Sequence, residues 1–252
     1  MSRVGRISAE TTAARKAFLR RRTAVFFTFF FPLLIVVIFG ALVQTQPGGG
    51  GLFTEPAVFY VPGYLAVVVL FTPLSRVGSE VARHREGNRF EKLATTPLSR
   101  PEWLVGQTLV NVAVIGLAGV LVLALMVLLT GASIVLTPTS IALGVAFLVV
   151  GVTLFCGVGA LLGSYADSQD GVIAASNGIA LPLLFLSETF VPTTLLPAWL
   201  PTGLSPLTYF SRGVRLLATG GSTSAAVENL AVLVVVGIAL FFAGALALPR
   251  TD

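Results

Sequence analysis

Charged side chains are scarce in this 252-residue chain, and cysteine and histidine each occur once. Only 11% of the residues are charged, against roughly 25% in an average soluble domain. The lone Cys156 excludes a disulfide framework and a thiolate metal cluster, and one histidine without a His-Glu-x-x-His motif leaves zinc hydrolysis without its parts. Neither lysine, Lys16 or Lys92, follows a glycine, so the sequence lacks a nucleotide loop of the Gly-x-x-x-x-Gly-Lys type. We therefore expect a chain that is not an enzyme.

Long apolar runs dominate the sequence instead, because 55% of its residues are hydrophobic. Several stretches approach the ~20 apolar residues that cross a hydrocarbon layer of about 30 Å. The first run is long enough to span and has no small-residue cleavage site, so we interpret it as a retained helix. We predict an all-α membrane protein with a single domain over residues 1–252. Its six predicted transmembrane helices are residues 24–43, 57–75, 103–129, 141–163, 171–187 and 229–248.

The segments between these runs differ sharply in charge. Residues 1–23 are rich in arginine and predict an interfacial helix on an anionic membrane surface. Residues 76–102 hold six basic and four acidic side chains, whereas residues 188–228 hold four prolines and only short apolar pieces. Of the 16 lysines and arginines, 14 fall on one side of the six spans and 2, Arg212 and Arg215, on the other. Because cytoplasmic loops are rich in these residues, we expect a multi-pass protein of the cell (inner) membrane with both termini in the cytoplasm.

Residues 83–99 are the most informative segment of the chain. One interpretation is a solvated connection held by ion pairs at helical neighbour spacings. That interpretation leaves Phe90, Leu93 and Ala94 unexplained, which would form the apolar face of a short helix that Pro97 stops. A charged helix with an apolar stripe suits docking in a groove of a soluble partner. We favour docking over the solvated connection.

The same segment resembles the permease subunits of type 2 ABC exporters. Members commonly carry an Arg/Glu-rich stretch, then Gly-Thr-Leu-Glu, two or three residues, and Thr-Pro, between helices 2 and 3. The matching residues here are Glu86, Glu91, Leu93, Thr96 and Pro97. Asn88 and Arg89 stand where Gly-Thr is usual, a departure that bears on the contact geometry. The likeness covers almost the whole chain, through Phe39-Gly40, Gly106, Leu186-Ser187 with Pro192, Leu196-Pro197-x-Trp199-Leu200, and Ser205-Pro206-Leu207-Thr208-Tyr209 followed by Arg215.

This resemblance implies the membrane-spanning permease of an ATP-driven exporter that works with two separate ATPase subunits and a second permease, a copy of itself or a related chain. It implies that ATP and magnesium bind to the ATPases and that this chain holds no cofactor. It also implies a cytoplasmic coupling helix between helices 2 and 3, and short re-entrant helices between helices 5 and 6. The residues expected at the ATPase contact are Glu86, Phe90, Glu91, Leu93, Thr96 and Pro97.

The resemblance is greatest to the drug- and lipid-exporting branch, because the outer loops are short and the spans nearly wholly apolar. We therefore expect a hydrophobic or amphipathic substrate, contacts with membrane lipids and no nucleic-acid partner. Export rather than import rests on the resemblance alone.

Two polar residues are candidates for the translocation path. Asn177 lies inside the fifth predicted helix, where its amide either lines the route or forms a hydrogen bond between helices. Glu188 stands where the family usually has glycine, so its carboxylate either contacts the substrate or caps the turn that follows. We expect the lone His84, in the charged segment, to be solvated.

The alternative function is a self-sufficient channel or secondary transporter. Such proteins usually place ionisable groups near the midplane of the membrane and often contain inverted repeats. The first four predicted spans and the sixth contain no clear charge, and the sequence shows no repeat. These observations favour a permease that takes its energy from a partner.

Overall fold

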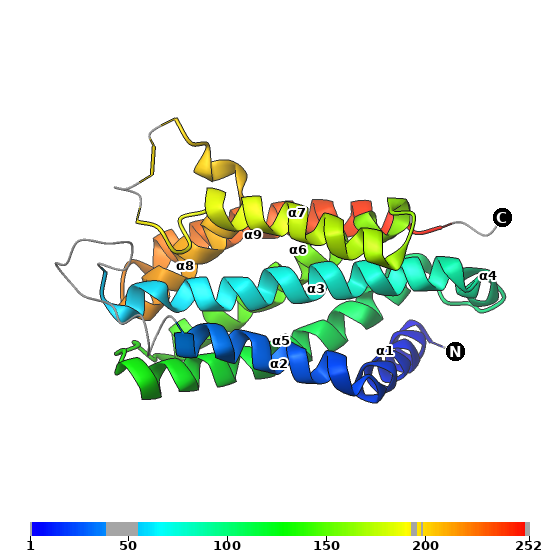
Figure 1. Ribbon diagram of the computed structural model, residues 1–252, viewed down its shortest axis with the longest axis horizontal. Helices are drawn as coiled ribbons and strands as arrows, with labels where there is room; N and C mark the ends of the chain where they lie inside the picture. The colour runs from blue at the N-terminus through cyan, green and yellow to red at the C-terminus, as the bar shows by residue number, and fades with distance from the viewer. Residues whose placement is uncertain (1, 39–54, 193–195, 198, 250–252) are drawn as a thin grey trace.

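The structure is a computed structural model that describes residues 2–38, 55–192, 196–197 and 199–249. The described residues form helices and no strand, which confirms the predicted all-α class (Figure 1). In chain order the elements are α1 (Arg3–Arg20), α2 (Arg22–Val36), η2 (Ala57–Tyr60), α3 (Val61–Glu86), α4 (Arg89–Ala94), α5 (Arg100–Thr130), α6 (Pro138–Tyr165), α7 (Gln169–Leu186), η4 (Thr202–Leu204), α8 (Pro206–Thr219) and α9 (Thr223–Ala247).

Within the described residues, five helical stretches are long and apolar enough to cross a membrane: η2 with α3, α5, α6, α7 and α9. Each coincides with one of the last five predicted spans. The first predicted span, residues 24–43, is helical in α2 as far as Val36. Its last residues, and most of the connection that follows them, lie outside the described residues. The chain is therefore a multi-pass membrane protein, and α2 is its shorter apolar helix.

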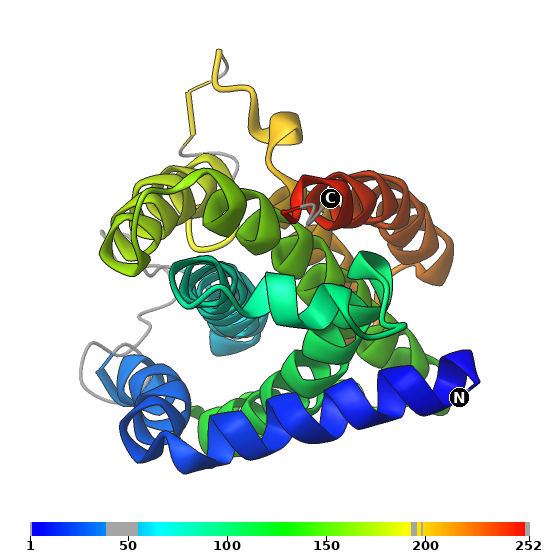
Figure 2. The same ribbon diagram turned by 90° about the vertical axis from the view of Figure 1, so that its right-hand side faces the viewer.

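Helix α3 occupies the centre of the bundle, with other helices around it (Figure 2). In its most apolar stretch 67% of the residues are buried, the largest share among the candidate spans. Helix α6 approaches α3 closely through glycine. A Cβ at Gly159 would lie 2.6 Å from the carbonyl oxygen of Leu74, and one at Gly163 would overlap the carbonyl oxygen of Gly78. The Gly159-x-x-x-Gly163 pattern thus packs two helices of the same chain.

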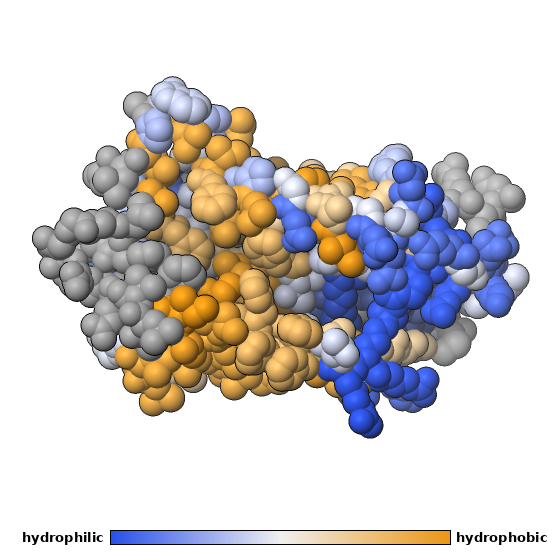
Figure 3. All heavy atoms as spheres, viewed as in Figure 1, coloured by the Kyte–Doolittle hydropathy of each residue, from blue (hydrophilic) through white to orange (hydrophobic). Residues whose placement is uncertain are grey.

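One end of the bundle gathers the polar elements. Helix α1 crosses this end and packs against α5, burying Ala14 and Phe18. Helix α4 lies at the same end, and Arg100 at the start of α5 donates hydrogen bonds to the carbonyls of Leu246 and Leu248 at the end of α9. We call this end, with α1, α4 and the last turns of α3, the basic end. Hydrophilic side chains collect there on the face shown in Figure 3.

Helix α3 continues past Ser75, where we expected the second span to end, and remains helical to Glu86. In its last roughly three turns Glu80 is buried and Arg76 and Arg83 are half-buried, whereas Arg85 and Glu86 are exposed. Partners outside α3, such as Arg21 for Glu80 and Asn111 for Arg76, stabilise the buried part as a helix. The predicted loop 76–102 therefore consists of the end of α3, all of α4 and the first residues of α5.

The opposite end is built by residues that follow α7. The region 188–228, predicted to hold short re-entrant helices, contains η4, the amphipathic helix α8 and the start of α9. Helix α8 ends at Gly220, whose φ of 73° lies in the left-handed region that glycine adopts readily. The backbone N–H of Val135, in the α5–α6 connection, donates to the carbonyl of Ala218 at 2.9 Å. The apolar residues that α8 buries are Leu207, Phe210, Val214 and Leu217.

Candidate functional site

The predicted coupling segment, residues 86–97, begins at the end of α3 with a sharp turn. Gly87 donates its N–H to the carbonyl of Arg83 at 3.1 Å and ends that helix. Asn88 then adopts a left-handed conformation with φ 50°, which asparagine tolerates better than most residues other than glycine. The sequence resemblance expects glycine at Asn88, and asparagine is one of the residues that can adopt the left-handed conformation seen here. After this turn, α4 lies at the basic end of the bundle.

Phe90 of α4 points into the bundle. Its ring forms an aromatic cluster with His84 of α3 and Trp103 of α5, and all three pairs of ring centroids are 5.4 Å apart. Phe90 is 8% exposed and Trp103 only 2%. The His84 side chain is 12% exposed, and its Nδ1 lies 2.9 Å from the carbonyl oxygen of Glu80. The expectation of a solvated His84 was therefore wrong, because rings on two other elements cover it.

The outward face of the coupling segment is polar. Leu93 is half-buried and packs against the core, beside the buried Phe90. The hydroxyls of Thr95 and Thr96 donate to the carbonyls of Lys92 and Leu93, at 2.8 and 2.6 Å, and close the C-terminal turn. Of the predicted apolar face, Phe90 and Leu93 thus pack against the bundle, whereas Ala94 is exposed. The exposed residues are Arg89, Glu91, Lys92, Ala94, Thr95, Thr96 and Pro97.

Hydrogen bonds connect the end of α3 with two further helices. Glu86 Oε1 accepts the backbone N–H of Gln169 at the start of α7, at 3.1 Å. Arg85 donates to the carbonyls of Gly163 and Ala166 at the end of α6, at 3.1 and 2.8 Å. A displacement of the coupling segment would therefore reach α6 and α7 as well as α3 and α5.

A buried carboxylate, Glu80, joins α1 to α3 at the basic end. It is 8% exposed and pairs with Arg21 at 3.0 Å and with Arg83 at 3.2 Å. A buried charge is tolerated only with such partners. Arg76 precedes Glu80 by four residues on α3, a spacing typical of ion pairs. Arg76 instead lies 4.1 Å above the Phe18 ring of α1 and donates to Asn111 of α5 at 3.3 Å.

Two further contacts fasten α1 to α5. Arg6 donates to both carboxylate oxygens of Glu102, at 3.0 and 2.5 Å, although the two residues are 96 positions apart. Glu10 accepts a hydrogen bond from Gln107 at 2.9 Å, and burial between the helices raises the pKa of Glu10. Sequence reasoning found neither contact, because local spacing carries no signal for pairs so distant.

At the opposite end, Glu188 forms a clamp with Arg212. Arg212 binds both oxygens of the carboxylate, one of them at 2.7 Å, and Thr202 donates to it at 3.2 Å. Burial by itself would raise the pKa of Glu188, but the hydrogen bonds and charge of Arg212 lower it. Arg215 donates to the Glu188 carbonyl at 2.7 Å and lies 3.8 Å above the Phe59 ring. The carboxylate thus fastens the chain after α7 to α8.

Asn177 lies on a face of α7 that the chain leaves open. It is exposed, and the structure records no hydrogen bond for its amide within the described residues. In the apolar stretch of α7 only 17% of the residues are buried. Among the described residues, no hydrogen bond joins the Asn177 amide to Glu188. Exposed residues that share its face at intervals of four are Ile173, Leu181 and Phe185.

The described residues bring together charged and aromatic groups that hold helices in place. Within that part of the chain, no three His, Cys, Asp or Glu side chains gather in a way that could hold a metal. Cys156 is buried inside α6. The contacts of Phe90 with His84 and Trp103 join α4 to the membrane helices α3 and α5.

Comparison with known proteins identifies the family. A sequence model of the family described as "ABC-2 type transporter" matches residues 6–218. The match begins in α1 and ends in α8, so it includes the coupling segment, the clamp and all candidate spans except α9. No curated protein matches the chain.

Proposed function

The chain belongs to the family of ABC-2 type transporters, and from that premise we propose that it is the permease of an ATP-driven exporter. Two separate ATPase subunits bind ATP and magnesium, and this chain contributes the membrane path. The observation that carries the proposal is the aromatic cluster. It joins the exposed segment 89–97 to two membrane helices, as a coupling element requires.

The coupling contact uses the exposed face of the segment, with Glu91, Thr96 and Pro97 toward the ATPase. Phe90 and Leu93 hold the segment to the bundle. When nucleotide closes the ATPases, movement of α4 passes through the aromatic cluster to α3 and α5. Coupling of this kind requires that each conformation of the permease bind the ATPase with a different affinity. Glu86 extends the connection to α7.

The open face of α7 is where a second permease, a copy or a related chain, would pack. An amide such as that of Asn177 is poorly satisfied by hydrocarbon, so a partner helix or a hydrated path is expected beside it. We assign the translocation path to this face, between the two permeases. Its apolar side chains suit a hydrophobic or amphipathic substrate. Glu188 stands at the rim of the path as a clamp, because Arg212 and Thr202 occupy its oxygens.

The basic end faces the cytoplasm of the cell in this proposal. Fourteen of the 16 lysines and arginines belong to segments on that side, and cytoplasmic segments are enriched in these residues. The start of α1 and the end of α9 both lie at that end (Figure 1). The ATPases would then meet α4 where ATP is available.

Reconstitution tests the proposed function. Vesicles that contain the permease and a candidate ABC ATPase should export a hydrophobic dye only when ATP and magnesium are present. The two chains should elute together in detergent. Vesicles with the permease alone should move nothing. Substrate flux through the permease without an ATPase would instead support a self-sufficient channel or secondary transporter.

A further inference from the structure

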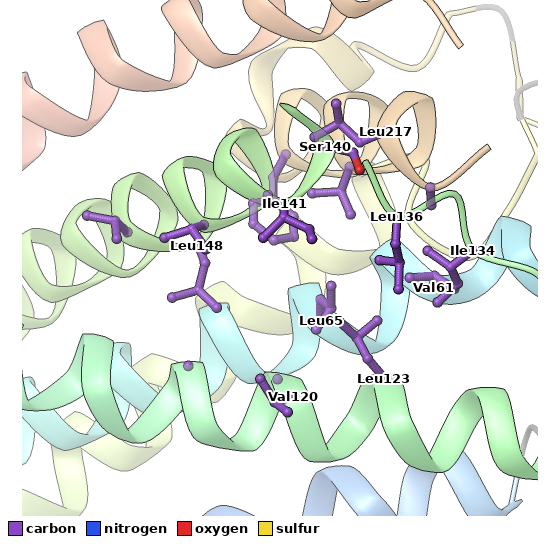
Figure 4. A pocket seen from close by; sticks show the side chains of 18 of the residues that line it. Val61, Leu65, Val120, Leu123, Ile134, Leu136, Ser140, Ile141, Leu148 and Leu217 are labelled. Atoms are coloured by element: carbon purple, nitrogen blue, oxygen red, sulfur yellow. The ribbon is translucent and has the colours of Figure 1, made fainter. Parts of the chain in front are cut away.

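An apolar groove of about 420 Å³ opens between α5 and α6 in the half of the bundle away from the basic end. Helix α3 forms its floor, and α8 together with residues 134–136 borders it (Figure 4). Side chains that point into the groove include Leu65, Leu123, Ile141 and Leu148. The groove is separate from the coupling segment and from the open face of α7.

Glycine residues keep this space open. A Cβ added at Gly116 of α5 or at Gly144 of α6 would meet no atom within 4 Å. Both positions therefore border empty space rather than a neighbouring helix. This differs from Gly159, where a Cβ would collide with the backbone of α3. Larger side chains at Gly116 and Gly144 would fill the groove without displacing the fold.

The lining excludes polar ligands. Among the described residues that line the groove, Ser140 is the one with a polar side chain. Its hydroxyl is already used, because it accepts the N–H of Thr137 at 2.8 Å and lies 3.0 Å from the carbonyls of Val135 and Thr137. Apolar cavities of this kind do not hold water. An occupant must therefore be hydrocarbon.

The groove opens sideways toward the bilayer. Residues at its mouth are largely exposed: Val120 is 62% exposed, Ile141 53% and Val145 57%. These residues belong to two candidate membrane spans, so hydrocarbon surrounds the mouth. Acyl chains of the bilayer are therefore the hydrocarbon that the mouth of the groove meets directly.

We propose that this groove binds an acyl chain of a bilayer phospholipid. The bound chain packs between α5 and α6 against Leu65 of α3 and fills space that the side chains leave empty. It supports the spacing of α5, α6 and α8 without taking part in transport chemistry. The proposal rests only on the membrane location of the chain and on the groove itself, so it stands independently of ATP-driven export.

Photolabelling tests this binding. The full-length protein is reconstituted in phosphatidylcholine vesicles that contain a small fraction of phosphatidylcholine with a diazirine in one acyl chain. After irradiation, mass spectrometry locates the lipid adducts. Leu123, Ile141 and Leu148 should carry several-fold more adduct than Val235, which is 68% exposed in the middle of α9. Equal labelling of the groove and Val235 would overturn the proposal.

A second experiment fills the groove with larger side chains and repeats the photolabelling. The double variant Gly116→Leu/Gly144→Leu should lose most groove adducts and keep those at Val235. Ala239→Leu is the control, because Ala239 is exposed on α9 and does not line the groove. If the double variant does not stay monodisperse, Gly144→Val alone should lower groove labelling in part. Undiminished labelling in a folded, filled variant would contradict an acyl-chain site.

Discussion

The ring of Phe90 lies edge-on against the indole of Trp103, with the two centroids 5.4 Å apart and the planes inclined by 68°. Phe90 belongs to the short helix α4, and Trp103 to the first turn of a membrane span. Together with His84 they fasten α4 to the bundle. The packing of Phe90 therefore holds α4 to the membrane helices, and the outward face of α4 is polar.

Phe90→Ala should lower the free energy of unfolding of the permease by about 2–4 kcal/mol, because it leaves a cavity between His84 and Trp103. Lys92→Ala, an exposed change on the same helix, should be neutral to within about 0.5 kcal/mol. Denaturant titration of the detergent-purified variants measures the difference. If Phe90→Ala and Lys92→Ala unfold alike, Phe90 does not anchor α4.

The Glu188–Arg212 clamp should contribute stability that depends on pH. Burial opposes ionisation of Glu188, but Arg212 outweighs it and lowers the pKa in the folded chain below the ordinary value of 4.5. The unfolded chain therefore takes up a proton at higher pH than the folded chain. The contribution is complete above pH 4.5 and is lost as the pH falls through the lowered folded pKa.

Glu188→Gln should accordingly destabilise the protein at neutral pH by about 1–3 kcal/mol, and the difference from the wild type should shrink in acid below the ordinary glutamate pKa. Thermal unfolding of both proteins across this pH range measures it. Transport normalised to folded protein should be retained. A stable Glu188→Gln variant with abolished transport would return Glu188 to the substrate path.

Gly178→Phe should weaken pairing with a second permease while sparing the fold of the single chain. A Cβ at Gly178 meets no atom within 4 Å, so the ring would project from the open face of α7. Gly178→Ala is the control and should pair normally. Energy transfer between labelled copies in vesicles reports pairing. Unchanged transfer for Gly178→Phe would remove this face from the contact.

Labelling should place the two ends of the bundle on opposite sides of the membrane. In a Cys156→Ala background, Ser224→Cys, at the start of α9, should react with an impermeant maleimide on intact cells. Asn88→Cys, between α3 and α4, should react only after permeabilisation. Both positions are exposed, so reactivity reports sidedness. Reaction of Asn88→Cys on intact cells would invert or refute the orientation.

Hydropathy predicted most of the membrane architecture because it is a local property of the sequence. The run 141–163, for example, lies wholly within α6. Helix α8 was expected only as one of the short helices that the resemblance implies between helices 5 and 6, without bounds. Ser205 and Pro206 stand at the expected start of a helix, and Gly220 at its end. Because proline also breaks helices, the four prolines of residues 188–228 do not give these bounds by themselves.

The orientation of the coupling helix could not be predicted from the sequence. Its apolar residues were recognised, but the amphipathic pattern does not say whether Phe90 faces a partner or its own bundle. Trp103, against which Phe90 packs, lies 13 positions further on in α5, and no local pattern links the two rings. The pairing of Arg6 with Glu102 could not be predicted for the same reason, since it depends on α1 packing across the first turn of α5. Tertiary packing settles such contacts.

We propose that the exposed face of α4 holds the ATPase. This is tested by the affinity of the ABC ATPase for monodisperse permease carrying Glu91→Lys, compared with Glu228→Lys, a charge reversal at another exposed position, at the opposite end. We expect Glu91→Lys to weaken binding about tenfold or more, with unchanged permease stability, and Glu228→Lys to bind like the wild type. Wild-type affinity for both variants would contradict the assignment of α4 as the coupling element.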